Sequence, residues 1–171
     1  MQSVPGVAAI VVMGVSGAGK STVGQLLAAR LGCPFRDADS FHPPANIAKM
    51  KSGAPLTDAD RWPWLGAIAA WIAEHRTAGT TCVVTCSALK RAYRDIVTDA
   101  QSADVRLAYL KGGFDLIAAR LAARKGHFMP PALLQSQFDA LEEPAPDEHA
   151  ITVPIDARPE QIAARVVDRL A

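Results

Sequence analysis

The chain has 171 residues, of which half are hydrophobic and a fifth are charged, and its formal net charge is +1. This length and balance favour one globular domain and exclude a disordered or low-complexity protein. The near-zero charge excludes a strong overall attraction to nucleic acid or an anionic membrane, and no apolar run approaches the ~20 residues that span a bilayer.

The N-terminal residues lack the basic start of a secretion signal. We interpret the three cysteines, at positions 33, 82 and 86, as reduced thiols. We therefore expect a single cytoplasmic domain over residues 1–171.

Apolar, β-branched segments alternate with segments of helical periodicity along the chain. The patterns predict strands over 7–13, 34–36, 80–86, 105–110 and 151–155, and helices over 20–31, 43–51, 58–78, 88–100, 114–125, 130–141 and 159–170. This order predicts an α/β fold with a doubly wound, five-stranded parallel sheet flanked by helices. Segment 142–149 has two prolines and four acids and predicts a surface loop, and we expect Arg91 and Arg94 to be surface charges.

A phosphate-binding loop follows the first predicted strand. The segment Gly14-Val15-Ser16-Gly17-Ala18-Gly19-Lys20-Ser21 matches G-x-x-x-x-G-K-[ST] at every fixed position, and Thr22 follows it. Glycines let the backbone N–H groups approach phosphate oxygens, and the next helix directs its positive end at the same anion. We expect Lys20 to reach the β- and γ-phosphates of ATP and the Ser21 hydroxyl to bind Mg²⁺.

Two aspartates, Asp37 and Asp39, come where the second strand should end. A carboxylate there can hold Mg²⁺ or take the proton of an attacking hydroxyl. The third strand ends in Ser87 without an acid, which favours Asp39 as the carboxylate near the metal and the transferred group. The alternative is a polar turn, which we consider more applicable to Asp37.

Polar and cationic side chains near Asp39 suit a small, polyhydroxylated, negatively charged acceptor. The candidates for acceptor binding are Asp39, His42, Asn46, Lys49, Arg61, Ser87 and Lys90. Asn46 and Lys49 are three apart on one predicted helix and would share a face. The alternative for each is an ordinary exposed side chain.

Arg120 and Arg124 are four apart on a predicted helix, and Lys125-Gly126-His127-Phe128 follows. Paired guanidiniums on one helix face can neutralise charge on a transferred phosphoryl group. We predict a mobile lid over residues 120–130 that closes over ATP, with His127 a further acceptor-side candidate. The alternative is a solvated basic helix end.

Together, these segments resemble the gluconokinase family of P-loop sugar-acid kinases. The resemblance rests on the P-loop and on segments 41–50, 53–65, 86–95, 124–129, 136–138 and 141–144. It implies Mg²⁺-dependent transfer of the ATP γ-phosphoryl group to the 6-hydroxyl of D-gluconate, in a cytoplasmic homodimer. Ala38 and Phe41 depart from the residues that are usual in the family, which could alter the fit of the acceptor.

The sequence is also compatible with two other functions. Shikimate kinase shares an Asp-x-Asp after its second strand, which Asp37 and Asp39 match. A regulatory protein that binds ATP without phosphorylating anything is a reading of a different class. The clustered acceptor-side groups argue against such a regulatory protein. ATP turnover with and without acceptor distinguishes a kinase from it, because only a kinase needs the acceptor.

Overall fold

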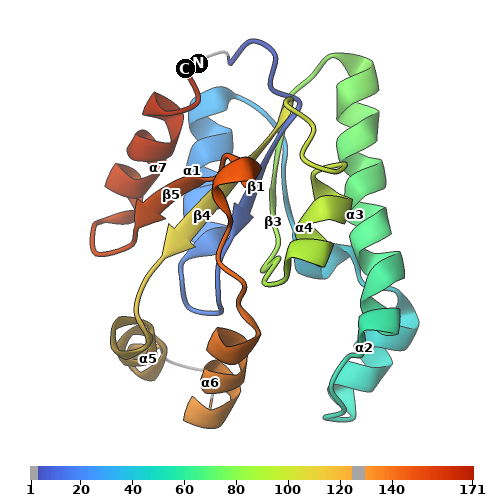
Figure 1. The fold of residues 1–171 in the computed structure, drawn as a ribbon, viewed down its shortest axis with the longest axis vertical. Coiled ribbons are helices and arrows are strands. Elements are labelled where there is room, and N and C mark those ends of the chain that lie inside the picture. Colours follow the sequence, from blue (N-terminus) through green and yellow to red (C-terminus); the bar gives the residue numbers. More distant parts are fainter. Residues whose placement is uncertain (1–3, 125–129) are drawn as a thin grey trace.

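Five short parallel strands form the centre of the molecule, as predicted (Figure 1). The structure, a computed structural model, describes residues 4–124 and 130–171. The strands lie in the order β2-β3-β1-β4-β5. Their bounds are β1 Ala9–Met13, β2 Phe35–Asp37, β3 Cys82–Thr85, β4 Val105–Lys111 and β5 Ile151–Pro154.

The strand order reverses between β1 and β3. Strand β1 pairs with β3 on one side, with Ile10 opposite Val83, and with β4 on the other, with Ile10 opposite Arg106. The chain leaves β1 toward β2 on one side of the sheet and leaves β3 toward β4 on the other. Ligands of such sheets bind at the carboxyl ends of the strands at this reversal.

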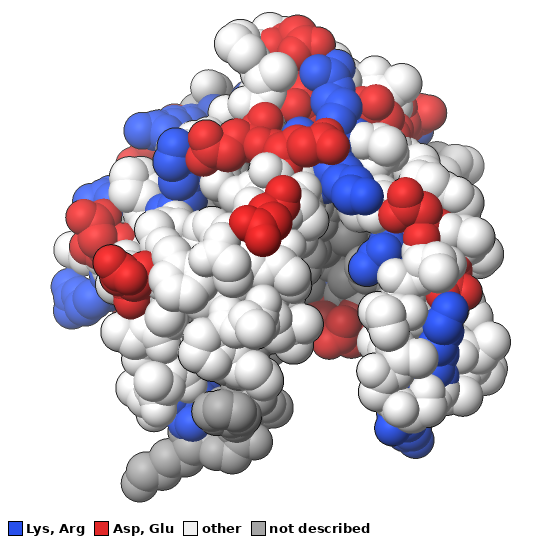
Figure 2. All heavy atoms as spheres, turned by 60° about the horizontal axis from the view of Figure 1, so that its bottom comes forward, with Lys and Arg blue, Asp and Glu red and all other residues white. Residues whose placement is uncertain are grey.

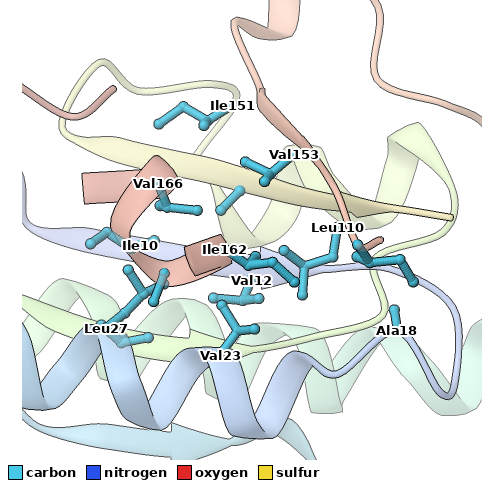
Figure 3. Close-up of a cluster of buried hydrophobic side chains, with 14 of the residues drawn as sticks. Ile10, Val12, Ala18, Val23, Leu27, Leu110, Ile151, Val153, Ile162 and Val166 are labelled. Carbon is cyan, nitrogen blue, oxygen red and sulfur yellow. The ribbon is translucent and has the colours of Figure 1, made fainter. Parts of the chain in front are cut away.

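Helices cover both faces of the sheet. Helices α1 and α7 lie on one face, and α3 and α4 lie on the other (Figure 1). Figure 3 shows the first core, where Ile10 and Val12 of β1 meet Val23 of α1 and Ile162 of α7. The helices are α1 Lys20–Leu31, α2 Pro44–Lys51, α3 Asp58–Ala78, α4 Arg91–Val97, α5 Phe114–Ala123, α6 Pro131–Ala140 and α7 Pro159–Asp168.

The long helix α3 has both ends specified by sequence. Thr57 accepts a hydrogen bond from the Asp60 backbone N–H, and the Asp60 carboxylate accepts one from the Thr57 N–H, which together form a capping box. Gly79 closes the helix in the left-handed conformation, with φ of 66°. The predicted bounds of this helix are confirmed.

Helix α4 is shorter than predicted. It spans Arg91–Val97 instead of 88–100, because Ala88 has a φ of 46° and Lys90 is extended. Residues 99–101 also take positive φ values, which end the helix early.

The prediction that Arg94 is a surface charge is wrong. Its side chain is 1% exposed and pairs with Glu148, which is 2% exposed, at 2.6 Å between Nε and Oε1. Segment 142–149 is therefore not only a surface loop, since Glu148 reaches inward. Arg91 is partly exposed and pairs with Asp147 at 2.8 Å.

Helices α2, α5 and α6 lie beyond the carboxyl ends of the strands (Figure 1). Figure 2 turns this end forward and shows a hollow between two lobes, with acidic and basic side chains around it. In residues 4–124 and 130–171, no helix is both long and apolar enough to cross a membrane. The three cysteines are free thiols, with Cys82 and Cys86 buried.

Candidate active site

The P-loop connects β1 to α1 at the reversal of strand order. Gly19 precedes α1 in the left-handed conformation, with φ of 90°, and no side chain caps the helix. The first N–H groups of α1 therefore have no side-chain acceptor and point toward the loop. A second glycine of the loop, Gly17, is required by packing, because a Cβ there would lie 2.8 Å from Leu121 Cγ of α5.

A cavity of ≈ 210 Å³ lies inside the P-loop, and we call it the phosphate cavity. Its walls come from the P-loop, from the turn after β2, from the end of β3 and from α3. They comprise Ser16, Gly17, Gly19, Lys20, Ser21, Asp37, Ala38, Asp39, Trp64, Thr85, Cys86, Ser87 and Arg124. Val15 and Ala18 instead pack into the core beneath the loop, and Thr22 is exposed on the first turn of α1.

Lys20 is held at the base of the phosphate cavity. Its Nζ donates to the Val15 carbonyl at 3.1 Å, which curls the side chain back over the loop. Burial lowers the pKa of Lys20, while the nearby acidic groups, among them Asp37 and Asp39, oppose that effect. An anion in the cavity would stabilise the charged form of this lysine.

Asp37, rather than Asp39, is the carboxylate next to Ser21. The Ser21 hydroxyl donates to Asp37 Oδ2 at 2.6 Å, and the Asp39 backbone N–H donates to Asp37 Oδ1 at 3.0 Å. Burial alone would raise the pKa of Asp37, but hydrogen bonds from Ser21, the Asp39 N–H and Thr85 outweigh it and lower the pKa. The contact favours Asp37 over Asp39 as the partner of Ser21, because a carboxylate and a hydroxyl side by side are oxygen donors of the kind that Mg²⁺ prefers.

A larger cleft of ≈ 530 Å³ adjoins the phosphate cavity, and we call it the acceptor cleft. The two share Ser16, Asp39, Trp64 and Ser87 as walls. Asp39 thus faces both spaces at their junction. The remaining walls of the acceptor cleft are His42, Met50, Pro55, Leu56, Arg61, Ala88, Leu89, Lys90, Tyr93, Leu133, Ser136, Gln137 and Ala140.

Arg61 and Lys90 lie close together in the acceptor cleft. Both lie near one carboxylate oxygen of Asp58, at 3.6 Å for Arg61 and 3.8 Å for Lys90. The Tyr93 hydroxyl donates to the same carboxylate, and this bond is the main reason that the pKa of Asp58 is lowered. Among the described residues, Asp58 is the only carboxylate within ion-pair distance of these two cations, which suits an anionic ligand.

His42 lines the acceptor cleft and stacks on Trp64, with ring centroids 4.4 Å apart and an interplanar angle of 12°. Burial lowers the pKa of His42, with Asp39 raising it and Arg61 lowering it further. Burial therefore favours the neutral form of the ring. The Trp64 indole N–H donates to the Ala38 carbonyl at 2.8 Å, which fixes the stack against the turn that carries Asp39.

Two predicted acceptor ligands lie elsewhere. Asn46 is 5% exposed, and its amide donates to the Asp60 carbonyl at 2.9 Å and contacts His42 Nδ1 at 3.3 Å. Lys49 pairs with the Asp60 carboxylate at 2.6 Å. Both side chains fasten α2 to the start of α3 and do not line the cleft.

The prediction that Arg120 and Arg124 share a helix face is also wrong. Helix α5 ends at Ala123, and Arg124 is extended, with ψ of 121°. Arg124 lines the phosphate cavity, whereas the guanidinium of Arg120 donates to the Ile155 carbonyl at the edge of the sheet. His127 and the rest of 125–129 lie outside the described residues, so the predicted lid stays a prediction.

Sequence reasoning missed several residues of the site. Thr85 accepts from the Ala38 N–H at 3.3 Å, and Trp64 and Tyr93 line the cavities. Gln137 bonds to the P-loop residue Ser16 from 121 positions away. Trp64, Tyr93 and Gln137 fall inside the segments that carry the family resemblance, which was the only available signal for them.

Comparison with known proteins agrees with this geometry. The family model for shikimate kinase matches residues 16–171. A probable gluconokinase of Mus musculus is 48% identical, over 97% of this chain and 98% of the mouse chain. A gluconokinase of Gluconobacter oxydans is 45% identical, over 92% of this chain and 88% of its own. The crystal structure of a gluconokinase from Sinorhizobium meliloti superimposes with a TM-score of 0.87 at 43% identity, covering 99% of this chain and 93% of that one.

Proposed function

This chain belongs to the gluconokinase family, and we propose that it transfers the γ-phosphoryl group of ATP to the 6-hydroxyl of D-gluconate. The products would be 6-phospho-D-gluconate and ADP. The observation that carries the proposal is the meeting of two cavities at Asp39. One is built from a P-loop, and the other holds the paired cations Arg61 and Lys90.

On the nucleotide side, the P-loop N–H groups and Lys20 would hold the phosphates of ATP. Ser21 and Asp37 offer the oxygen donors that Mg²⁺ prefers, so they would hold this ion together with the nucleotide. Bound Mg²⁺ would neutralise charge between the β- and γ-phosphates. Arg124 would contact the transferred group from the opposite wall.

On the acceptor side, Arg61 and Lys90 would bind the carboxylate of gluconate. Ser87 and neutral His42 offer polar groups to its hydroxyls. Asp39 lies at the junction of the two spaces, where it would accept the proton of the attacking hydroxyl as the oxygen–phosphorus bond forms. The phosphoryl group would move from the phosphate cavity into the acceptor cleft, with ADP as the leaving group.

Shikimate is the competing acceptor, because the shikimate kinase model covers most of the chain. The high identity to gluconokinases over almost the whole chain favours gluconate. An ADP-release assay over gluconate, shikimate and other aldonic acids separates the two. Gluconate should give the highest kcat/KM, and a higher value for shikimate would reverse the assignment.

A non-catalytic ATP switch is the remaining alternative. A switch would bind ATP with no acceptor-dependent release of ADP, whereas the acceptor cleft beside the phosphate cavity favours a kinase. The family resemblance leads us to propose also that the enzyme is a cytoplasmic homodimer. Light scattering on the purified protein measures the oligomeric state.

A further inference from the structure

A pair of hydrogen bonds joins the P-loop to helix α6. The Ser16 backbone N–H donates to Gln137 Oε1 at 2.7 Å, and Gln137 Nε2 donates to Ser16 Oγ at 2.9 Å. One amide side chain therefore fixes both the backbone and the hydroxyl of a single loop residue. Neither partner carries a charge, and both are partly buried.

Ser16 occupies the wall between the two cavities. It lines both the phosphate cavity and the acceptor cleft. The next residue, Gly17, packs so closely on α5 that a Cβ would meet Leu121. The outer side of the loop is thus packed against α5 at Gly17 and bonded to α6 at Ser16, which fixes where the Ser16 hydroxyl lies.

The Ser16 hydroxyl can make more hydrogen bonds than the one that it makes with Gln137. A serine hydroxyl has one hydrogen to donate and two positions that accept. Gln137 Nε2 fills one accepting position, and among the described residues no acceptor takes the hydroxyl hydrogen. That hydrogen is free to donate to a ligand in either cavity. A phosphoryl group that passes between them carries negatively charged oxygens through this place.

We propose that Ser16 Oγ donates a hydrogen bond to the transferred phosphoryl group, and that Gln137 is the positioning residue that orients this hydroxyl. The inference rests on the proposed kinase reaction and adds to it. By occupying an accepting position on Oγ, the Gln137 amide leaves the hydroxyl hydrogen directed at the ligand. Since the group gains charge-assisted bonds during transfer, the effect should fall on kcat more than on KM.

A double-mutant cycle tests the proposal. Ser16→Ala and Gln137→Ala should each lower kcat by about 10- to 100-fold, the range for loss of one donor to a charged group. KM for ATP and for the acceptor should stay within about threefold. The double variant should be no more than about threefold slower than the slower single variant, because Gln137 acts through the hydroxyl that Ser16→Ala has already removed.

Gln137→Glu keeps the size of the side chain and the acceptor for the Ser16 N–H. It replaces the donor with a carboxylate, which would capture the Ser16 hydroxyl hydrogen, so kcat should fall at least as far as in Ser16→Ala. Gln135→Glu is the matched control. It adds the same charge to the same helix at an exposed position, where the Gln135 amide donates to Asp139 and to no other described residue, and activity should stay within about twofold of wild type.

Thermal denaturation shows that each variant is folded, and the cycle uses whichever acceptor the wild-type enzyme phosphorylates fastest. A wild-type enzyme that ignores gluconate would refute the proposed acceptor alone. An active wild-type enzyme whose two single effects multiply in the double variant would refute the role of Gln137. A Ser16→Ala enzyme within about threefold of wild-type kcat would refute the role of Ser16.

Discussion

Asp37 gives the sharpest test of the site, because it, and not Asp39, bonds to Ser21, and we propose that these two residues hold Mg²⁺. Its two carboxylate oxygens accept from the Ser21 hydroxyl at 2.6 Å and from the Asp39 N–H at 3.0 Å. Asp37→Asn keeps the volume of the side chain but removes its charge and one of its two acceptors. The altered residue would no longer attract Mg²⁺ beside Ser21.

The size of the effect follows from the bonds that are lost. A hydrogen bond to a charged group contributes about 1.5–3 kcal/mol, and 1.4 kcal/mol corresponds to a factor of ten. Asp37 is only half-buried, so solvent screening favours the lower end of this range. We expect the Mg²⁺ concentration for half-maximal rate to rise by about tenfold.

The assay is the initial rate of ADP release over a Mg²⁺ titration at fixed ATP and gluconate. Asp39→Asn is the matched comparison, since Asp39 makes no side-chain bond to Ser21 among the described contacts and lies two residues away. Its Mg²⁺ dependence should stay within about twofold of wild type. If Asp37→Asn leaves the Mg²⁺ dependence unchanged while Asp39→Asn shifts it, the roles of the two aspartates are reversed.

Four further predictions address single residues. Asp39→Asn should lower kcat by about 10²-fold through loss of the proton acceptor, and an unchanged kcat would make Asp39 a turn residue. Lys20→Ala should nearly abolish turnover in a folded protein; activity within about threefold of wild type, measured by ADP release, removes Lys20 from the mechanism. Arg124→Lys keeps the charge and loses the planar fork, so steady-state kcat should still fall, and full activity would show that charge alone suffices. Arg94→Ala should cost about 3 kcal/mol in urea unfolding, because the buried Glu148 carboxylate loses its close ion pair and keeps only the Ala145 N–H and Arg91 at 3.8 Å, and a loss below ~1 kcal/mol would contradict this.

The contribution of the Arg94–Glu148 pair to the free energy of unfolding depends on pH. Burial alone would raise the pKa of Glu148, but the hydrogen bonds from Arg94 and the Ala145 N–H, together with the charges of Arg94 and Arg91, outweigh it and hold the pKa below the ordinary value of 4.5. The stability that Glu148 contributes is therefore complete at neutral pH. It is lost as the pH falls below 4.5 through the folded-state pKa, and the Arg94→Ala protein should lose this acid-side dependence.

Local sequence predicted the parts of the site that local sequence builds. The P-loop is a run of eight residues whose glycines dictate the backbone, and the structure places it between β1 and α1 as expected. The predicted bounds of α3 match the structure, where a cap at Thr57 and the left-handed Gly79 fix the two ends. These features need only neighbouring residues, so a single sequence is enough to predict them.

Several predictions about side chains failed because contacts between segments that are distant in the sequence determine where those side chains lie. Asn46 and Lys49 do share a face of α2, but both side chains bond to Asp60 of the next helix instead of facing the acceptor cleft. Arg94 is buried because Glu148, 54 residues away, pairs with it. Periodicity predicts which face of a helix a residue occupies and not which partner meets it.

Helix ends were the other source of error. The paired-arginine prediction required α5 to continue past Arg124, whereas the chain turns extended at that residue. Arg124 reaches the phosphate cavity because the helix stops, and Arg120 stays on the helix near Ile155. A shift of two residues in one boundary was enough to separate the pair.

A gluconokinase releases ADP only when gluconate is present to accept the phosphoryl group, and this dependence can be measured on the purified protein. Purified enzyme is supplied with MgATP, and ADP release is followed with no acceptor, with D-gluconate and with shikimate. We predict that release is slow without acceptor, rises by at least about 10²-fold with gluconate and yields 6-phospho-D-gluconate in equal amount to ADP. Release that is the same with and without gluconate, or that is stimulated more by shikimate, would contradict the account.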